Sequence, residues 1–141
     1  AGNYLENLAR TLSDIDRTTR DIEVLLAPVK RFPFMTFHDG FQYFERAFTL
    51  NSVGWIAVDA GRRPSAKRLS ALRRTLRDSG AKCLFSEPQF APSLLRTVAE
   101  GTGAQTGSLD PLGSGIEPGP AHWGETMLAL GRSLRSCLSR R

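Results

Sequence analysis

The sequence predicts an α/β fold, in which a four-stranded parallel sheet flanked by helices follows a long N-terminal linking helix. The first observation behind this prediction is a stripe of apolar residues with alternating three- and four-residue spacing near the start of the chain. The second is the alternation of short apolar runs with amphipathic stretches, which is typical of βαβ units. With 141 residues, the chain is long enough for one such domain with its own core.

The first expected element is a long helix from residue 5 to about residue 29. Its apolar stripe consists of Leu5, Leu8, Leu12, Ile15, Ile22, Leu26 and Val29, with Thr19 in the one gap. So narrow a stripe on so long a helix is typical of a helix that runs along a domain or links two domains, and a coiled-coil seam is the alternative. Pro28 is expected to end the helix near its last turn.

Four strands are expected after this helix, over residues 34–37, 53–58, 83–86 and 105–109. Helical patterns follow the strands, beginning near Phe41, Pro64, Pro92 and His122. In the first of these patterns Phe41, Phe44 and Phe48 recur at helical spacing, which favours a core position over a platform for stacking bases. Because strands and helices alternate, the sheet is expected to be parallel.

The composition limits the classes of partner. A net charge of +5 and a pI near 9.9 raise the question of nucleic acid or an anionic membrane. The arginines, however, are spread over several expected helices, which favours an ordinary solvated surface. No apolar run is long enough for a transmembrane helix, and the chain opens directly into a helical pattern without a signal-like segment. We therefore expect a mature, cut or truncated chain, and secretion stays open.

Residues with useful chemistry follow the expected strands, where open α/β sheets bind their ligands: His38, Asp39, Asp59, Glu87 and Asp110. An imidazole and a carboxylate, as in His38 and Asp110, form a pair that zinc accepts, but structural zinc normally takes four ligands. No G-x-S-x-G, H-E-x-x-H or G-x-G-x-x-G pattern occurs, and no catalytic set is complete. A partly buried structural histidine and a hydrolase that uses His38 with Asp110 are the alternatives.

The two cysteines, Cys83 and Cys137, are far apart and show no C-x-x-C spacing. This arrangement argues against zinc-finger or thioredoxin-like chemistry. Their even number allows one disulfide in an oxidising compartment. Two buried free thiols are an equally acceptable interpretation of the residues alone.

Three segments carry a resemblance to a known family: Phe-His-Asp-Gly at 37–40, continuing to Tyr43-Phe44; Leu-Phe-Ser-Glu-Pro-Gln-Phe at 84–90; and Leu-Asp-Pro-Leu-Gly at 109–113. They resemble the C-terminal lobe of periplasmic zinc-binding proteins of the ZnuA type, which serve ABC importers and have two lobes joined by one long helix. The resemblance implies that residues 1–31 are the connecting helix and residues 32–141 the C-terminal α/β lobe. The N-terminal lobe is absent from this chain.

The resemblance also assigns site residues. His38 matches the histidine ligand of this lobe, and Asp110 matches an acid that is a ligand in manganese-type relatives and lies beside the metal in zinc-type ones. Ala57 stands where manganese-type relatives have a glutamate, and the loss of that oxygen ligand favours zinc. Cys83 and Cys137 match two cysteines that form a disulfide in some zinc-type members.

The function implied is zinc capture in the periplasm for delivery to an ABC importer permease, without enzymatic activity. This chain would supply half of the metal site, so on its own it is expected to bind zinc weakly or not at all. Its partners would be the zinc ion, the permease and the missing N-terminal lobe, and no nucleic acid. The uncovered face of the lobe, with Phe41, Trp55 or Trp123 as candidates, is expected to promote self-association. The alternative is an anion- or nucleic-acid-binding α/β module that uses the basic helices.

Overall fold

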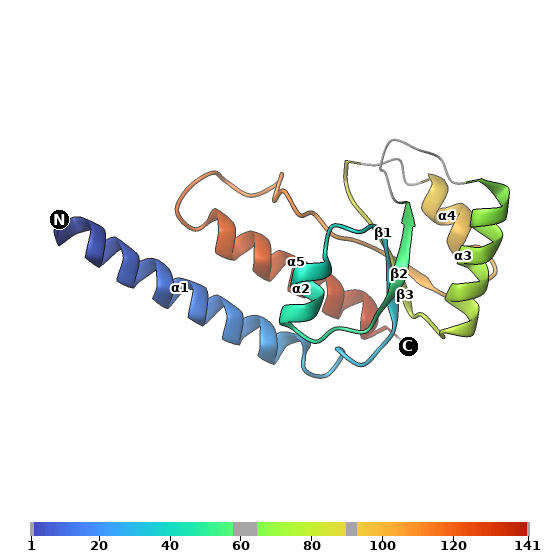
Figure 1. Cartoon of the computed structure of the whole chain (residues 1–141), viewed down its shortest axis with the longest axis horizontal. Coiled ribbons are helices and arrows are strands. Elements are labelled where there is room, and N and C mark those ends of the chain that lie inside the picture. Colours follow the sequence, from blue (N-terminus) through green and yellow to red (C-terminus); the bar gives the residue numbers. More distant parts are fainter. Residues whose placement is uncertain (1, 58–64, 90–92, 141) are drawn as a thin grey trace.

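The computed structural model describes residues 2–57, 65–89 and 93–140. The elements are α1 (Gly2–Leu26), β1 (Phe34–His38), α2 (Gln42–Ala47), β2 (Ser52–Ala57), α3 (Ala66–Asp78), β3 (Cys83–Ser86), α4 (Ser93–Ala99), β4 (Gln105–Ser108) and α5 (His122–Leu138). The strands form one parallel sheet in the order β2-β1-β3-β4. The predicted fold class is confirmed, and Figure 1 shows α1 projecting away from the sheet. The predicted strand end at Val58, and Asp59 after it, lie outside the described residues.

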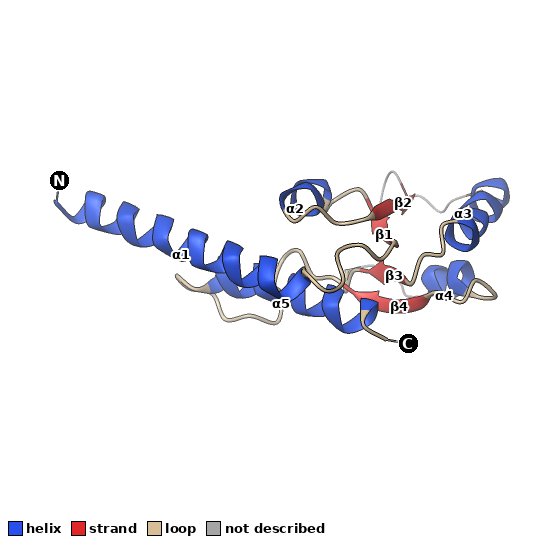
Figure 2. Cartoon of the chain, turned by 90° about the horizontal axis from the view of Figure 1, so that it is seen from below, coloured by secondary structure: helices blue, strands red, loops and turns tan. Residues whose placement is uncertain are grey.

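Helices cover both faces of the sheet because side chains alternate along each strand. Phe34 and Phe85 contribute to a core shared with α1, α2 and α5, and their rings meet edge to face with centroids 5.7 Å apart. Met35 and Leu84, which are the sequence neighbours of these two phenylalanines, belong to a second core with α3 and α4. Figure 2 shows the resulting layers, with α1, α2 and α5 on one side of the strands and α3 and α4 on the other.

The apolar stripe of α1 is divided between two environments. Ile22 and Leu26 are buried in the same core as Leu130 and Leu134 of α5. The earlier part of the stripe is exposed, with Leu8 at 54% and the apolar residues around it likewise open: Tyr4, Leu5, Leu12 and Ile15. The helix ends at Leu26, three residues before the predicted end, and the segment that follows forms turns.

One prediction about the surface is wrong. Phe41 was expected among the candidates for an exposed face, but only 5% of it is accessible, because it packs in the core with Phe44 and Phe48. This burial confirms the prediction that the three phenylalanines are core residues. Trp55 and Trp123, the other two candidates, are indeed exposed.

The disulfide between Cys83 and Cys137 joins the sheet to the last helix, as the resemblance implied. Cys83 is the first residue of β3, and Cys137 lies in the last turn of α5. Both sulfur-bearing residues are buried in the core on the α1 side of the sheet. Because β1 and β3 are parallel, the disulfide lies at the amino end of the sheet, whereas His38 ends β1 at the opposite pole.

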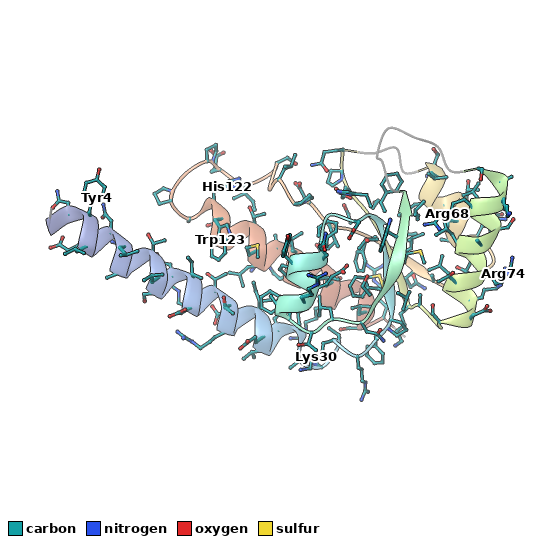
Figure 3. The ribbon with its side chains drawn as sticks, viewed as in Figure 1. Tyr4, Lys30, Arg68, Arg74, His122 and Trp123 are labelled. Carbon is teal, nitrogen blue, oxygen red and sulfur yellow. A yellow bond between two sulfur atoms is a disulfide. The ribbon has the colours of Figure 1, made fainter. Side chains whose placement is uncertain are left out.

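The arginines of α3 lie at the far end of the molecule from the start of α1, as the labelled Arg68, Arg74 and Tyr4 show in Figure 3. Two of these arginines donate hydrogen bonds to backbone carbonyl groups of neighbouring segments. Arg68 donates to the carbonyl of Trp55 over 3.3 Å, and Arg73 donates through Nε to the carbonyl of Thr97 over 3.0 Å. None of the helices that the structure describes combines the length and apolarity needed to cross a membrane.

Candidate metal site

His38 stands at the carboxyl end of the sheet because it is the last residue of β1. Its ring Nδ1 hydrogen-bonds to Oε1 of Glu87, the residue that directly follows β3. The side chain of His38 is 30% exposed, whereas Glu87 is 3% exposed. The imidazole therefore reaches the surface while its carboxylate partner lies beneath it.

Two further residues border the imidazole of His38. A Cβ placed on Gly40 would lie 2.5 Å from Nε2, so the ring edge that carries this nitrogen lies against the glycine. The ring of Phe41 meets the imidazole edge to face, with the centroids 6.1 Å apart. A side chain at position 40 would therefore force the histidine ring to move from this position.

The electrostatics of Glu87 connect the acidic and basic groups of this pole. Burial raises the pKa of its carboxyl above the ordinary value, because the charged form loses hydration. The hydrogen bond and the charge of His38 act in the opposite direction and favour the carboxylate. The negative charge of Asp110 raises the pKa of Glu87 further, so His38 and Asp110 both lie within electrostatic reach of Glu87.

Asp110 lies in the loop after β4 and organises the turn around itself. Its Oδ1 accepts from Nε2 of Gln89 at 3.0 Å and from the backbone N–H of Leu112 at 3.1 Å. Its Oδ2 accepts from the backbone N–H of Ser114 at 2.7 Å and from the Ser114 hydroxyl at 2.6 Å. Burial alone would raise the pKa of Asp110, but these hydrogen bonds outweigh it and lower the pKa to about 2. Asp110 is therefore a fixed negative charge at neutral pH.

Only some of the candidate site residues predicted from the sequence lie together in the structure. His38, Glu87 and Asp110 share the carboxyl pole, as expected for strand ends of a parallel sheet. The direct partner of His38 is Glu87, which was expected at this edge of the sheet but without an assigned role. Asp39 is exposed, and Asp59 lies outside the described residues. The contact with Glu87 could have been found by aligning the ends of the two strands.

The arrangement offers one imidazole and nearby carboxylates but not a closed coordination shell. Among residues 2–57, 65–89 and 93–140, no three histidine, cysteine, aspartate or glutamate side chains are grouped so that they could hold a metal ion. A zinc site normally needs four ligands. What this pole can do chemically is contribute a neutral nitrogen and negative charge to a site completed from outside the described residues.

Comparison with known proteins agrees with this description. The sequence model of the family described as "Zinc-uptake complex component A periplasmic" (ZnuA) matches residues 1–137. The high-affinity zinc uptake system protein ZnuA of Brucella suis biovar 1 (strain 1330) is 41% identical over 140 residues, which cover 99% of this chain and 42% of the relative. The chain thus spans less than half the length of this curated relative.

Solved structures show the same likeness. A crystal structure of ZnuA superposes with a TM-score of 0.78 at 28% identity, covering 95% of this chain and 47% of that one. A ZnuA deletion mutant with zinc bound superposes with a TM-score of 0.76, also at 28% identity, covering 98% of this chain and 50% of that one. In both cases about half of the solved chain has no counterpart here.

Proposed function

The chain belongs to the ZnuA family of periplasmic zinc-uptake components, and from this premise we propose that it supplies one half of a zinc-capture site in the periplasm. Zinc would be cargo, passed on to the permease of an ABC importer, and the role would be binding and release without catalysis. The observation that carries the proposal is the position of His38, a surface-reaching imidazole at the ligand-binding end of the sheet, in a chain whose relatives are named for zinc uptake. The rival role, an anion- or nucleic-acid-binding module, has no support from these relatives.

In this proposal His38 donates a nitrogen to zinc, and Asp110 contributes negative charge beside the cation. Both oxygens of Asp110 already accept two hydrogen bonds each, so a direct bond from Asp110 to zinc requires the displacement of one donor. The remaining ligands would come from an N-terminal lobe of the same protein. Alone, the chain is therefore expected to bind zinc weakly.

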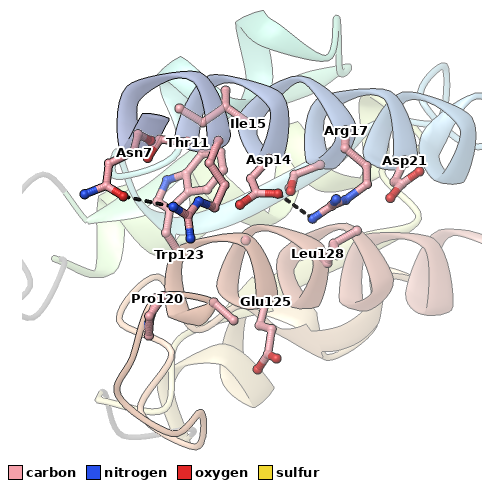
Figure 4. Close-up of a pocket in the computed structure, with 14 residues that line it drawn as sticks. Asn7, Thr11, Asp14, Ile15, Arg17, Asp21, Pro120, Trp123, Glu125 and Leu128 are labelled. Carbon is pink, nitrogen blue, oxygen red and sulfur yellow. Dashed lines mark hydrogen bonds and ion pairs between the residues drawn. The ribbon is translucent and has the colours of Figure 1, made fainter. Parts of the chain in front are cut away.

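We assign residues 1–31 to a connecting helix and residues 32–141 to the C-terminal lobe. The exposed half of α1 supports this division, because its apolar side chains have no cover within the described residues. A groove of about 800 Å³ runs between α1 and α5, where Ile15, Trp123 and Leu128 contribute apolar surface (Figure 4). The occupant that we propose for this face is the N-terminal lobe, since the relatives are more than twice as long as this chain.

Sedimentation of the wild-type chain and of the Leu8→Glu variant tests whether the exposed apolar stripe of α1 is a surface that another protein surface normally covers. Without the lobe, a second copy is expected on the exposed stripe, so the wild type should associate at high concentration and the variant should not. A wild-type chain that stays monomeric at high concentration would contradict self-association. Association that persists in the variant would place the contact elsewhere.

A zinc titration tests the metal proposal. The two histidines of the chain provide a matched pair, because His122 lies at the start of α5, where its Nε2 is 3.3 Å from the carbonyl oxygen of Gly113. His38→Ala is expected to abolish the weak binding of zinc, whereas His122→Ala is expected to leave it unchanged. Sub-nanomolar affinity of this chain as a monomer, or equal binding by wild type and His38→Ala, would contradict the proposal.

A further inference from the structure

We propose that Glu87 is a positioning residue for zinc: its carboxylate accepts the Nδ1 proton of His38, which leaves Nε2 as the nitrogen that meets the metal. The inference rests on the proposed function, since it concerns how His38 is presented to zinc. It adds a residue that is not itself a ligand, and it specifies which ring nitrogen binds.

The first support is the register of the sheet. In the pairing of β1 with β3, Thr36 lies opposite Phe85. Continuing this register by two residues places His38 opposite Glu87, so the backbones of two adjacent, central strands set the distance between the pair. A hydrogen bond anchored in this way does not depend on a long loop, and it fixes one end of the imidazole relative to the whole sheet.

The second support is the burial of the carboxylate. A buried ionisable group needs a hydrogen-bond partner, because its hydration is lost. For Glu87 that partner is the ring of His38. Asp110 is less suited to the same task, since donors from Gln89, Leu112 and Ser114 occupy both of its oxygens. Of Glu87 and Asp110, Glu87 is thus the carboxylate that is available to hold the histidine.

The third support is the set of neighbours that pack against the imidazole ring. The ring edge with Nε2 lies against Gly40, which is itself exposed, and position 40 carries no side chain to cover it. Phe41 packs edge to face against the ring and limits its rotation. Glu87 on Nδ1, Gly40 against the ring edge with Nε2 and an aromatic ring alongside together favour one orientation of the imidazole.

The position of the single N–H proton on the imidazole determines which ring nitrogen can bind zinc. A neutral imidazole carries one N–H, so a proton held on Nδ1 by a carboxylate leaves the lone pair on Nε2. Metal-binding histidines commonly use this arrangement, and loss of the outer partner typically weakens metal binding by about 10- to 100-fold. Removing Glu87 should therefore weaken zinc binding by a factor in that range without removing a ligand.

The direct test is the tautomer of the neutral His38 ring in the wild-type chain, measured by ¹⁵N NMR of the imidazole. The expected spectrum has a protonated Nδ1 and an unprotonated Nε2, and addition of zinc should shift the Nε2 resonance. A proton on Nε2 in the zinc-free protein, or zinc bound through Nδ1, would overturn the inference. This measurement requires no variant, so it does not depend on whether a substituted protein folds.

Variants supply the second test. Glu87→Leu keeps the volume of the side chain but removes the oxygen that accepts the Nδ1 proton of His38. This variant is expected to lose the fixed tautomer of His38 and to bind zinc about 10- to 100-fold more weakly. Glu100→Gln, at an exposed carboxylate just after α4, is the control for loss of a negative charge and should change neither. If Glu87→Leu melts normally and keeps both the tautomer and the affinity of the wild type, Glu87 does not position His38.

The failure of this inference can be told from that of the proposed function. If His38→Ala abolishes zinc binding while Glu87→Leu leaves it unchanged, zinc capture through His38 stands and the role of Glu87 is wrong. If His38→Ala binds zinc as well as the wild type does, the proposed function itself fails, whatever the tautomer of His38.

Discussion

Reduction of the disulfide between Cys83 and Cys137 should destabilise this chain strongly while leaving the pole that carries His38 intact. The bond closes a loop with a sequence separation of 54 residues. In the chain-entropy treatment, cross-linking a loop of that length restricts the unfolded chain enough to stabilise the native state by about 4 kcal/mol. The unfolding entropy of a protein with 141 residues is about 0.3 kcal/mol/K. The melting temperature should therefore fall by roughly 14 °C on reduction.

The measurement is a pair of thermal melts, with and without a thiol reductant, for the wild type and for Cys83→Ala with Cys137→Ala. The reductant should lower the melting temperature of the wild type and leave that of the double variant unchanged. Zinc affinity at a temperature below both transitions should be the same in reduced and oxidised protein, because the bond and His38 lie at opposite ends of the sheet. A shift of only a degree or two, or two alkylatable thiols before reduction, would refute the reasoning.

Three further predictions concern single residues. Leu26→Ala should cost about 2–5 kcal/mol in the free energy of unfolding, whereas Leu8→Ala on the exposed half of the same helix should stay within about 0.5 kcal/mol, as denaturant titration would show. Gly40→Ala should push the His38 ring from its place and weaken zinc binding with little change in melting temperature, and unchanged affinity would contradict the close approach of the two residues. Burial, and to a lesser degree the charge of Asp39, raise the pKa of Glu45 in the folded state. The contribution of Glu45 to wild-type stability is therefore fully present below its unfolded pKa and is lost as pH rises through its folded pKa. Glu45→Gln should be more stable than the wild type at neutral pH but not at acidic pH.

The sequence predicted most of the fold because the relevant signals are local. Cys83–Ser86 was predicted with the bounds that the structure has, since a short apolar run between a glycine turn and Glu87-Pro88 leaves little freedom. The last helix was predicted to follow His122-Trp123, and it begins slightly earlier, at His122 itself. Such elements are determined by spacing over a few residues, which one sequence displays fully.

What the sequence alone did not reveal depends on contacts between distant segments. The hydrogen bond between His38 and Glu87 spans 49 positions and requires the register of two strands. Helical spacing predicted a core position for Phe41, but which residues line the uncovered face depends on how α2 packs on the sheet, and the placement of Phe41 on that face was wrong. The exposure of Leu8 could not be predicted from the apolar stripe either. The spacing of the stripe is the same along α1, but only its later residues, such as Ile22 and Leu26, pack in the core with α5.

The division of α1 has a dynamic consequence. A helix of 25 residues is about 37 Å long, and its first half must hold together without a packed neighbour. An isolated helix of about 12 residues, the length of this half, is marginal in water, and α1 has no acidic residue in its first turn. Its exposed ion pair between Arg17 and Asp14 adds little. Backbone amides before Leu12 should therefore exchange with solvent quickly, whereas those near Ile22 should be protected, so that docking of any partner along α1 would also complete the folding of the helix.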